Sequence, residues 1–238
     1  MPPVGFFASS VGTYSSANGT EIFLTPAAAR PNDVLLAAIV APSSSPMVAP
    51  SGWSLMASDA AGAPVSMTTY LFRRTVAQTE PAQHSFGVGL GLGPQPVGLL
   101  MAWHSVDNGA AIVAHGLALV SPTSTAFPAP SIVLAHYSDL TLLVYYAESG
   151  AGLTPTFVLP AGATQLGATV YAASGGGTLV VAQYLKEAVG ATGALSATCS
   201  ATNTGLAAQY GVQAYPTLLA PSVIPDIPGA IGFPTIGV

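Results

Sequence analysis

The chain has 238 residues, half of them apolar, which is enough to build a sizeable core in one large β domain or two small ones. Only 5% of the residues are charged, against about 25% in an ordinary soluble domain, and the net charge is −5. Four cations make nucleic acid a poor partner, because phosphate binding needs many Lys or Arg side chains, and the high apolar content excludes a disordered chain.

So little charge leaves a surface of Ser, Thr, Gly, Ala and Pro, which is poorly protected against association. We therefore expect much of this surface to be buried against neighbours in a larger assembly. No apolar run reaches the 18 or so residues of a membrane span, and residues 1–7 lack the basic start of a secretory signal. Cys199 has no second cysteine to pair with and no basic neighbour, so we expect an inert thiol in a protein made in a cytosol.

Along the chain, short apolar or alternating runs are separated by turns rich in Gly and Pro, and clear helical periodicity is almost absent. Residues 1–20 are interpreted as an N-terminal arm or an edge strand, and residues 107–130 as a link with one short strand, 112–120. The pattern predicts an all-β, antiparallel β-sandwich or jelly roll over residues 21–216. Strands are expected at residues 21–25, 34–40, 53–57, 67–76, 84–90, 97–106, 131–136, 140–147, 154–158, 164–171, 178–186, 194–201 and 206–215.

One faint pattern occurs twice. In each copy an acidic residue precedes an apolar strand, a Pro-x-Gly turn follows, and a later strand carries Tyr-Leu ahead of a cation. The matching positions are Asp33 and Asp139, Pro50 and Pro160, and Tyr70 and Tyr184. The repetition predicts pseudo-duplicated halves at about residues 21–110 and 131–216.

After Thr217 the strand pattern stops, and prolines punctuate an apolar tail over residues 217–238. Such a tail cannot fold alone, so we expect it to lie extended on its own sandwich or on a neighbouring subunit. The residues predicted to serve assembly are the apolar side chains near the two ends: Phe6, Phe7, Ile224, Ile227, Ile231, Phe233 and Ile236.

The sequence contains no convincing catalytic, cofactor or metal site. The four histidines do not pair at the spacing of metal ligands, and Ser105 next to His104 points to the opposite face of a strand. Asp33 and Asp139 fit turn hydrogen bonds at strand starts better than acid–base chemistry. An enzyme would require two or three of a scattered set to converge in one pocket: His84, His104, His136, Asp107 and Asp139.

Aromatic residues offer a further alternative, a carbohydrate-binding module that recognises a host surface glycan. This function requires a row of exposed rings, whereas most of the aromatics lie in apolar strands and fit core packing better. The set is Trp53, Tyr70, Trp103, Tyr145, Tyr146, Tyr184 and Tyr210.

Several phrases of the chain resemble a family of phage and prophage virion proteins that have a β-sandwich of two similar halves. The first half carries the resemblance at Asn32 to Ala37, Pro50 to Leu55, Tyr70 to Arg73, Glu80-Pro81 and Trp103 to Asp107. The second carries it at Ser138 to Leu140, Leu159 to Gly162 and Gly190 to Gly193, with Ala163 in place of the turn tryptophan. The resemblance covers about residues 20–216, and this family has no catalytic motif to transfer.

The resemblance implies a non-enzymatic structural protein of a tailed-phage virion, made in the host cytoplasm. The expected place is a minor tail or tail-tip component, with a capsid decoration protein as the close variant. Expected partners are other virion proteins and further copies of the chain, with the host glycan as the alternative; no cofactor, nucleic acid or membrane span is expected.

Overall fold

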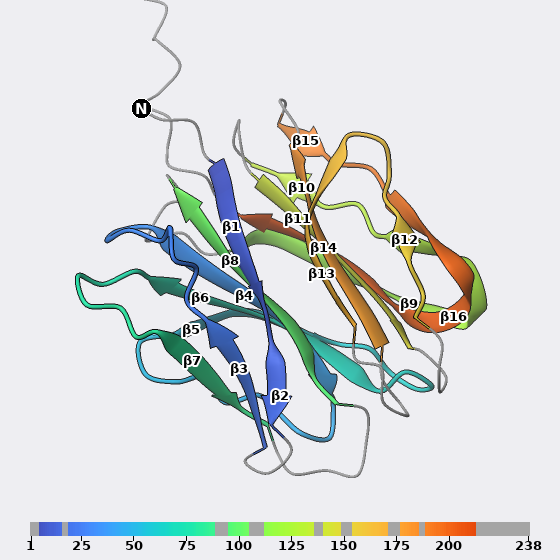
Figure 1. The fold of residues 1–238 in the computed structure, drawn as a ribbon. Coiled ribbons are helices and arrows are strands. Elements are labelled where there is room, and N and C mark those ends of the chain that lie inside the picture. The colour runs from blue at the N-terminus through green and yellow to red at the C-terminus, as the bar shows by residue number, and fades with distance from the viewer. Residues whose placement is uncertain are drawn as a thin grey trace, which may run out of the picture.

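The computed structural model describes residues 5–15, 19–88, 95–104, 112–135, 140–148, 154–170, 177–185 and 189–212, and every regular element in them is a strand (Figure 1). These ranges contain no long apolar helix of the kind that crosses a membrane. The strands are β1 (Gly5–Val11), β2 (Thr13–Ser15), β3 (Thr20–Leu24), β4 (Val34–Pro42), β5 (Ser54–Ala60), β6 (Met67–Thr75), β7 (Gln83–Gly87), β8 (Val97–His104), β9 (Ile112–Ala129), β10 (Val133–Leu134), β11 (Leu140–Glu148), β12 (Phe157–Val158), β13 (Ala163–Val170), β14 (Gly177–Leu185), β15 (Gly190–Ala191) and β16 (Leu195–Val212).

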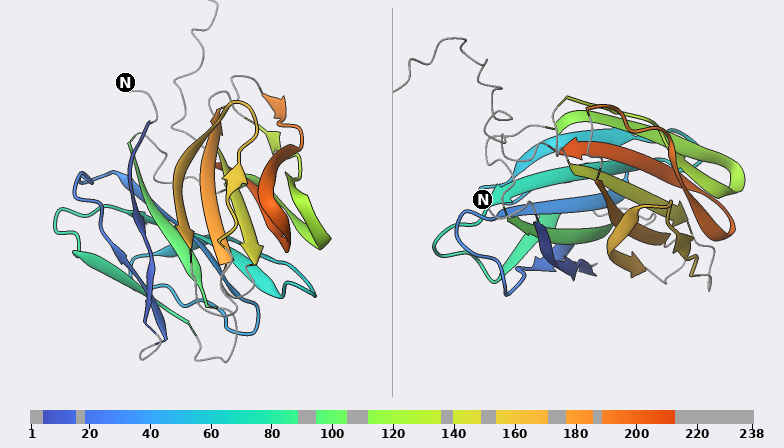
Figure 2. Two further views of the ribbon diagram at one scale, coloured as in Figure 1. Left: turned by 45° about the vertical axis from the view of Figure 1, so that its right-hand side comes forward. Right: turned by 90° about the horizontal axis from the view of Figure 1, so that it is seen from above.

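Two large antiparallel sheets form the body of the molecule (Figure 2). The five-stranded sheet has the order β1-β8-β4-β6-β5, and the six-stranded sheet has the order β12-β16-β11-β14-β13, with β9 paired to β16. Two smaller sheets, β2-β3-β7 and β10-β15, complete the fold. The prediction of an all-β antiparallel sandwich is therefore confirmed.

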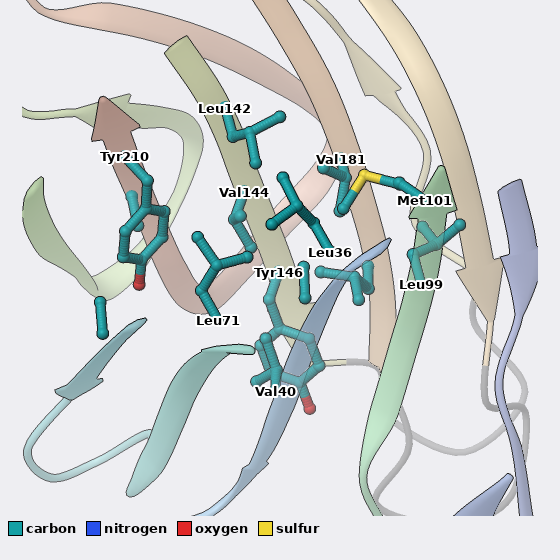
Figure 3. Close-up of a cluster of buried hydrophobic side chains, with 14 of the residues drawn as sticks. Leu36, Val40, Leu71, Leu99, Met101, Leu142, Val144, Tyr146, Val181 and Tyr210 are labelled. Atoms are coloured by element: carbon teal, nitrogen blue, oxygen red, sulfur yellow. The ribbon is translucent and has the colours of Figure 1, made fainter. Parts of the chain in front are cut away.

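The largest core cluster lies between the two large sheets (Figure 3). Alternate residues of the central strand of each sheet meet there, for example Leu36 and Val40 of β4 and Leu142 and Tyr146 of β11. Period-two alternation places these side chains on one face of each strand. Apolar contact between the central strands thus holds the two sheets together.

The opposite faces of both sheets are also covered. Leu35 and Ile39 of β4 pack with Phe23 and Phe86 of the small β2-β3-β7 sheet. On the six-stranded sheet the far parts of β9 and β16 carry the covering residues, including Phe127. Every residue of β4 is buried as a result, which explains why its sequence is continuously apolar rather than alternating.

The two large sheets share one strand order. Counted along the chain, β8-β4-β6-β5 corresponds to β16-β11-β14-β13, and β1 and β9 each add to the outer side of the first strand.

The two predicted Pro-x-Gly turns also match. Trp53 N donates to Pro50 O at 3.3 Å and Ala163 N to Pro160 O at 3.1 Å, while Gly52 and Gly162 have φ values of 83° and 81°. The strand after each turn bulges at the same place, between Leu55 and Ala57 and between Gln165 and Gly167. A duplicated sequence would produce these correspondences, and the duplication itself stays a prediction.

One detail of the sequence repeat is wrong. In the sheets Val34 lies opposite Thr75, and Leu140 lies opposite Leu185. With the two sheets aligned on these central strands, Tyr184 corresponds to Arg74 and not to Tyr70. The two Tyr-Leu pairs therefore do not occupy equivalent positions. Strand pairing determines which residues correspond, and a match of two residues in the sequence does not.

Several element boundaries differ from expectation. Residues 5–11, interpreted as arm or edge strand, form β1, which pairs with β8 at the edge of the five-stranded sheet. Within the link expected to contain one short strand, residues 112–129 form the 18-residue strand β9. The two strands expected over 194–201 and 206–215 are joined in the single strand β16. The tail 217–238 lies outside the described residues.

Candidate functional site

A connected polar group surrounds His84 of β7, which is 4% exposed. Trp53 Nε1–H donates to His84 Nδ1 at 3.2 Å, and His84 Nε2 lies 3.2 Å from Thr25 Oγ1 and 3.3 Å from Glu80 Oε1. Glu80 in turn accepts hydrogen bonds from Arg74 Nε and from the backbone N–H of Ala77. The group fastens the turn after β6 to the small outer sheet.

This arrangement fixes the protonation of His84. Because Nδ1 accepts from the tryptophan, the single proton of the neutral ring sits on Nε2, where it points to Thr25 and Glu80. Burial lowers the pKa of His84, while the charge of Glu80 opposes that shift. A buried neutral imidazole whose two nitrogens both have partners is a structural element of the sandwich rather than an accessible base.

A second histidine pairs with the repeated acidic residue. His104 Nδ1, at the end of β8, lies 2.5 Å from Asp33 Oδ1, and Phe7 stacks on its ring at a centroid distance of 4.0 Å. The other carboxylate oxygen of Asp33 accepts from Arg30 N at 2.7 Å, which confirms the predicted turn hydrogen bond at the start of β4. Nothing in the sequence indicates His104 as the partner of Asp33, since the two residues meet only through the pairing of β4 with β8.

The enzyme alternative gains no support from these contacts. His84 and His104 have separate partner sets, and the described residues contain no group of three or more His, Cys, Asp or Glu side chains suited to a metal ion. The other members of the candidate set, His136, Asp107 and Asp139, lie outside the described residues, as does Ser105. Cys199 is buried, and its sulfur accepts from Asn203 Nδ2 at 3.6 Å, as expected of a structural thiol.

The aromatic residues considered for glycan stacking lie in the core. Six of the seven are at most 9% exposed: Trp53, Tyr70, Trp103, Tyr145, Tyr146 and Tyr210. Tyr184 is half-buried against the cluster on the outer face of the six-stranded sheet. The predicted core packing is confirmed for the buried six, and these rings do not form an exposed row.

Of the predicted assembly residues, the structure describes only two. Phe6 packs edge-on against Trp103 at 5.5 Å between ring centroids, and Phe7 stacks on His104. Both side chains are half-buried against their own chain. The others lie outside the described residues: Ile224, Ile227, Ile231, Phe233 and Ile236.

A feature that the sequence analysis did not single out is the free edge of β9. This strand pairs with β16 on one side, and no described strand pairs with it on the other. Its 18 residues include no Asp, Glu, Lys or Arg, which is the sequence signal that would have drawn attention to it. Near its bend, side chains that include Leu119, Thr123 and Pro128 border an open depression of about 450 Å³.

Comparison with known proteins gives no relative. No family model, curated protein or solved structure matches the chain.

Proposed function

We propose that this chain is a non-enzymatic structural protein of a tailed-phage virion, positioned in the tail or at its tip and held there by contacts with other virion proteins and copies of itself. The observation that supports this function best is the shortage of charge at the surface. Thirteen residues of 238 are charged, four basic and nine acidic, and several of these lie inside the fold.

Two acidic residues are buried, and one ion pair is largely buried. Glu21 is 1% exposed and Asp33 is 7% exposed, while the side chains of Arg74 and Glu80 are 15% and 9% exposed and pair with one another. Interspersed surface charge is what keeps an isolated domain apart from its neighbours. A surface depleted in this way favours burial in an assembly, where uncharged areas can be covered without removing ions from water.

The family resemblance of the sequence indicates which kind of assembly this is, a tailed-phage virion. Its phrases fall on structural positions: the start of β4 at Asp33, the turn at Gly52, and Glu80, which pairs with Arg74. The residues that carry the resemblance therefore maintain the sandwich, which is what a virion building block requires.

The test is to find the chain in purified particles. Phage released from cells that carry the gene should retain the protein through a density gradient, with detection by mass spectrometry. Antibody labelling in electron micrographs should then place it on the tail. Labelling on the capsid would replace the tail position by the decoration role, and complete absence from purified particles would refute the virion function.

A second experiment addresses the tail segment. Sedimentation of the full chain and of a variant that ends at residue 216 should show that association weakens when residues 217–238 are removed. A strictly monomeric species at high concentration in both would count against assembly through this segment.

A further inference from the structure

The free edge of β9 differs from the other edges of the two large sheets. An edge strand presents unpaired N–H and C=O groups, and proteins usually protect it with charges, prolines, bulges or short length. β1 bulges between Phe6 and Ala8, and β13 bulges between Gln165 and Gly167. β5 carries a bulge and Asp59 as well, and β12 is only two residues long.

β9 lacks these protections over residues 114–120. This stretch keeps one unbroken register with residues 205–211 of β16. Its sequence, Ala-His-Gly-Leu-Ala-Leu-Val, has no proline and no formally charged residue. Asp59 contacts the stretch from β5, and its carboxylate is already paired with His115. Among the described residues, this seven-residue, regular, uncharged edge has no strand partner on its outer side.

The apolar tail of the chain does not fit this edge as a strand. Proline cannot donate to a β ladder, and prolines at 216, 221, 225, 228 and 234 leave no proline-free run longer than residues 229–233. A five-residue run cannot pair along the whole seven-residue stretch. An uncharged, proline-free strand of the same length can pair along the whole stretch, and β9 itself is such a strand.

We propose that residues 114–120 of β9 pair antiparallel with the same residues of a second copy, joining two six-stranded sheets into one continuous sheet. A two-fold axis between the two paired strands makes the contact self-complementary. Each dimer therefore uses the free edges of both copies, and no third copy can add there. No formal charges within the two stretches oppose one another, and the backbone groups left open by each edge satisfy those of the other. The dimer is one contact of the assembly proposed above, and its biological purpose rests on that proposed function.

The test places a charge on the edge. Leu119 is an exposed apolar residue of β9, and Leu119→Lys puts an ammonium group beside each copy's edge, as natural edge strands do. Val170 is an exposed apolar residue of β13, at the opposite edge of the same sheet, so Val170→Lys is the matched control. Sedimentation velocity should show a wild-type dimer, a dimer dissociation constant raised about tenfold or more in L119K, and an unchanged constant in V170K.

Hydrogen exchange on the wild-type chain gives a second readout that does not depend on how L119K folds. Amides of residues 114–120 that point away from β16 should be protected at high concentration and exchange faster on dilution. Amides of β13 should show no such dependence.

A wild-type chain that is monomeric at about 100 µM, or equal dissociation constants for both lysine variants and wild type, would overturn the β9 dimer. Those results would leave the virion function intact, since recovery of the chain in purified particles tests that function separately. Absence from particles together with a β9 dimer in solution would instead refute the virion function alone.

Discussion

His115 Nδ1 of β9 lies 3.0 Å from Asp59 Oδ2 of β5, so one polar contact joins the edge strands of the two large sheets. Ser9 occupies the register position on β1 that His115 occupies on β9, and its hydroxyl donates to Leu166 O of β13 at 3.0 Å. Polar contacts from corresponding positions therefore tie the sheets at both edges of the apolar interface.

We expect the two edge contacts to stabilise the fold modestly and independently. His115→Ala removes a partly exposed pair and should lower the free energy of unfolding by up to about 1 kcal/mol. Ser9→Ala removes a neutral hydrogen bond and should lower it by about 0.5–1.5 kcal/mol. Urea denaturation of each single variant should measure the two losses. A double variant whose loss departs by more than about 0.5 kcal/mol from the sum would contradict independence.

The buried carboxyl of Glu21 makes stability depend on pH. Glu21 is 1% exposed in β3, its Oε2 has no hydrogen-bond partner, and burial raises its pKa from 4.5 to about 8. The folded state thus holds the proton more tightly than the unfolded chain. The contribution of this group to stability is fully present below pH 4.5 and is lost as the pH rises towards 8.

Glu21→Gln should remove that dependence because the amide does not ionise. Urea denaturation at about pH 4, 6 and 8.5 should show wild type and E21Q nearly equal in acid, with E21Q more stable by several kcal/mol at the alkaline end. Gly12→Ala is a useful contrast, since a Cβ there would overlap the Glu21 carboxyl and should destabilise the fold at every pH. A constant difference between E21Q and wild type across the range would show that Glu21 does not titrate in the folded chain.

The sequence predicted those parts of the fold that local chemistry determines. The predictions of β4 as a strand and of the two Pro-x-Gly turns are confirmed. A strand buried on both faces needs a continuous run of apolar residues, and a turn with a positive φ needs glycine. The sequence predicts two strands, 194–201 and 206–215, with a break over residues 202–205, where the structure has the single strand β16. The register does shift there, yet pairing with β9 resumes beyond the shift and keeps one strand.

The polar contacts could not be predicted in the same way. Asp33 and His104 are 71 residues apart and meet only because β4 pairs with β8, while Asp59 and His115 meet across two different sheets. No spacing rule connects such residues before the sheet order is known. The free edge of β9 could be predicted only in part, because its lack of charge is visible in the sequence but its position at the edge of a sheet is not.

The His84 group predicts a second pH dependence, opposite in sign to that of Glu21. Burial lowers the pKa of His84 below 6.5, so the folded state disfavours the imidazolium. Stability from this group is present above pH 6.5 and falls as the pH drops towards the folded pKa. An NMR titration of the histidine ring protons, with the His84 signal assigned by its loss in H84Q, should give a midpoint below 6.5. A midpoint at or above 6.5 would mean that the Trp53 hydrogen bond to Nδ1 does not persist in solution.

Gly205 provides the sharpest test of strand packing. A Cβ at this position of β16 would overlap the backbone carbonyl oxygen of Tyr146 and press on the Phe127 ring, and backbone atoms cannot swing aside as a flexible side chain can. Gly205→Ala should therefore destabilise the chain by about 1–3 kcal/mol or more, as overpacking does. Gly87→Ala is the matched control, because a Cβ there would meet Val48 only at ordinary contact distances of 3.6–3.8 Å. Thermal and urea unfolding should separate the two variants clearly, and equal stabilities would show that β16 does not approach β11 as closely as the structure places it.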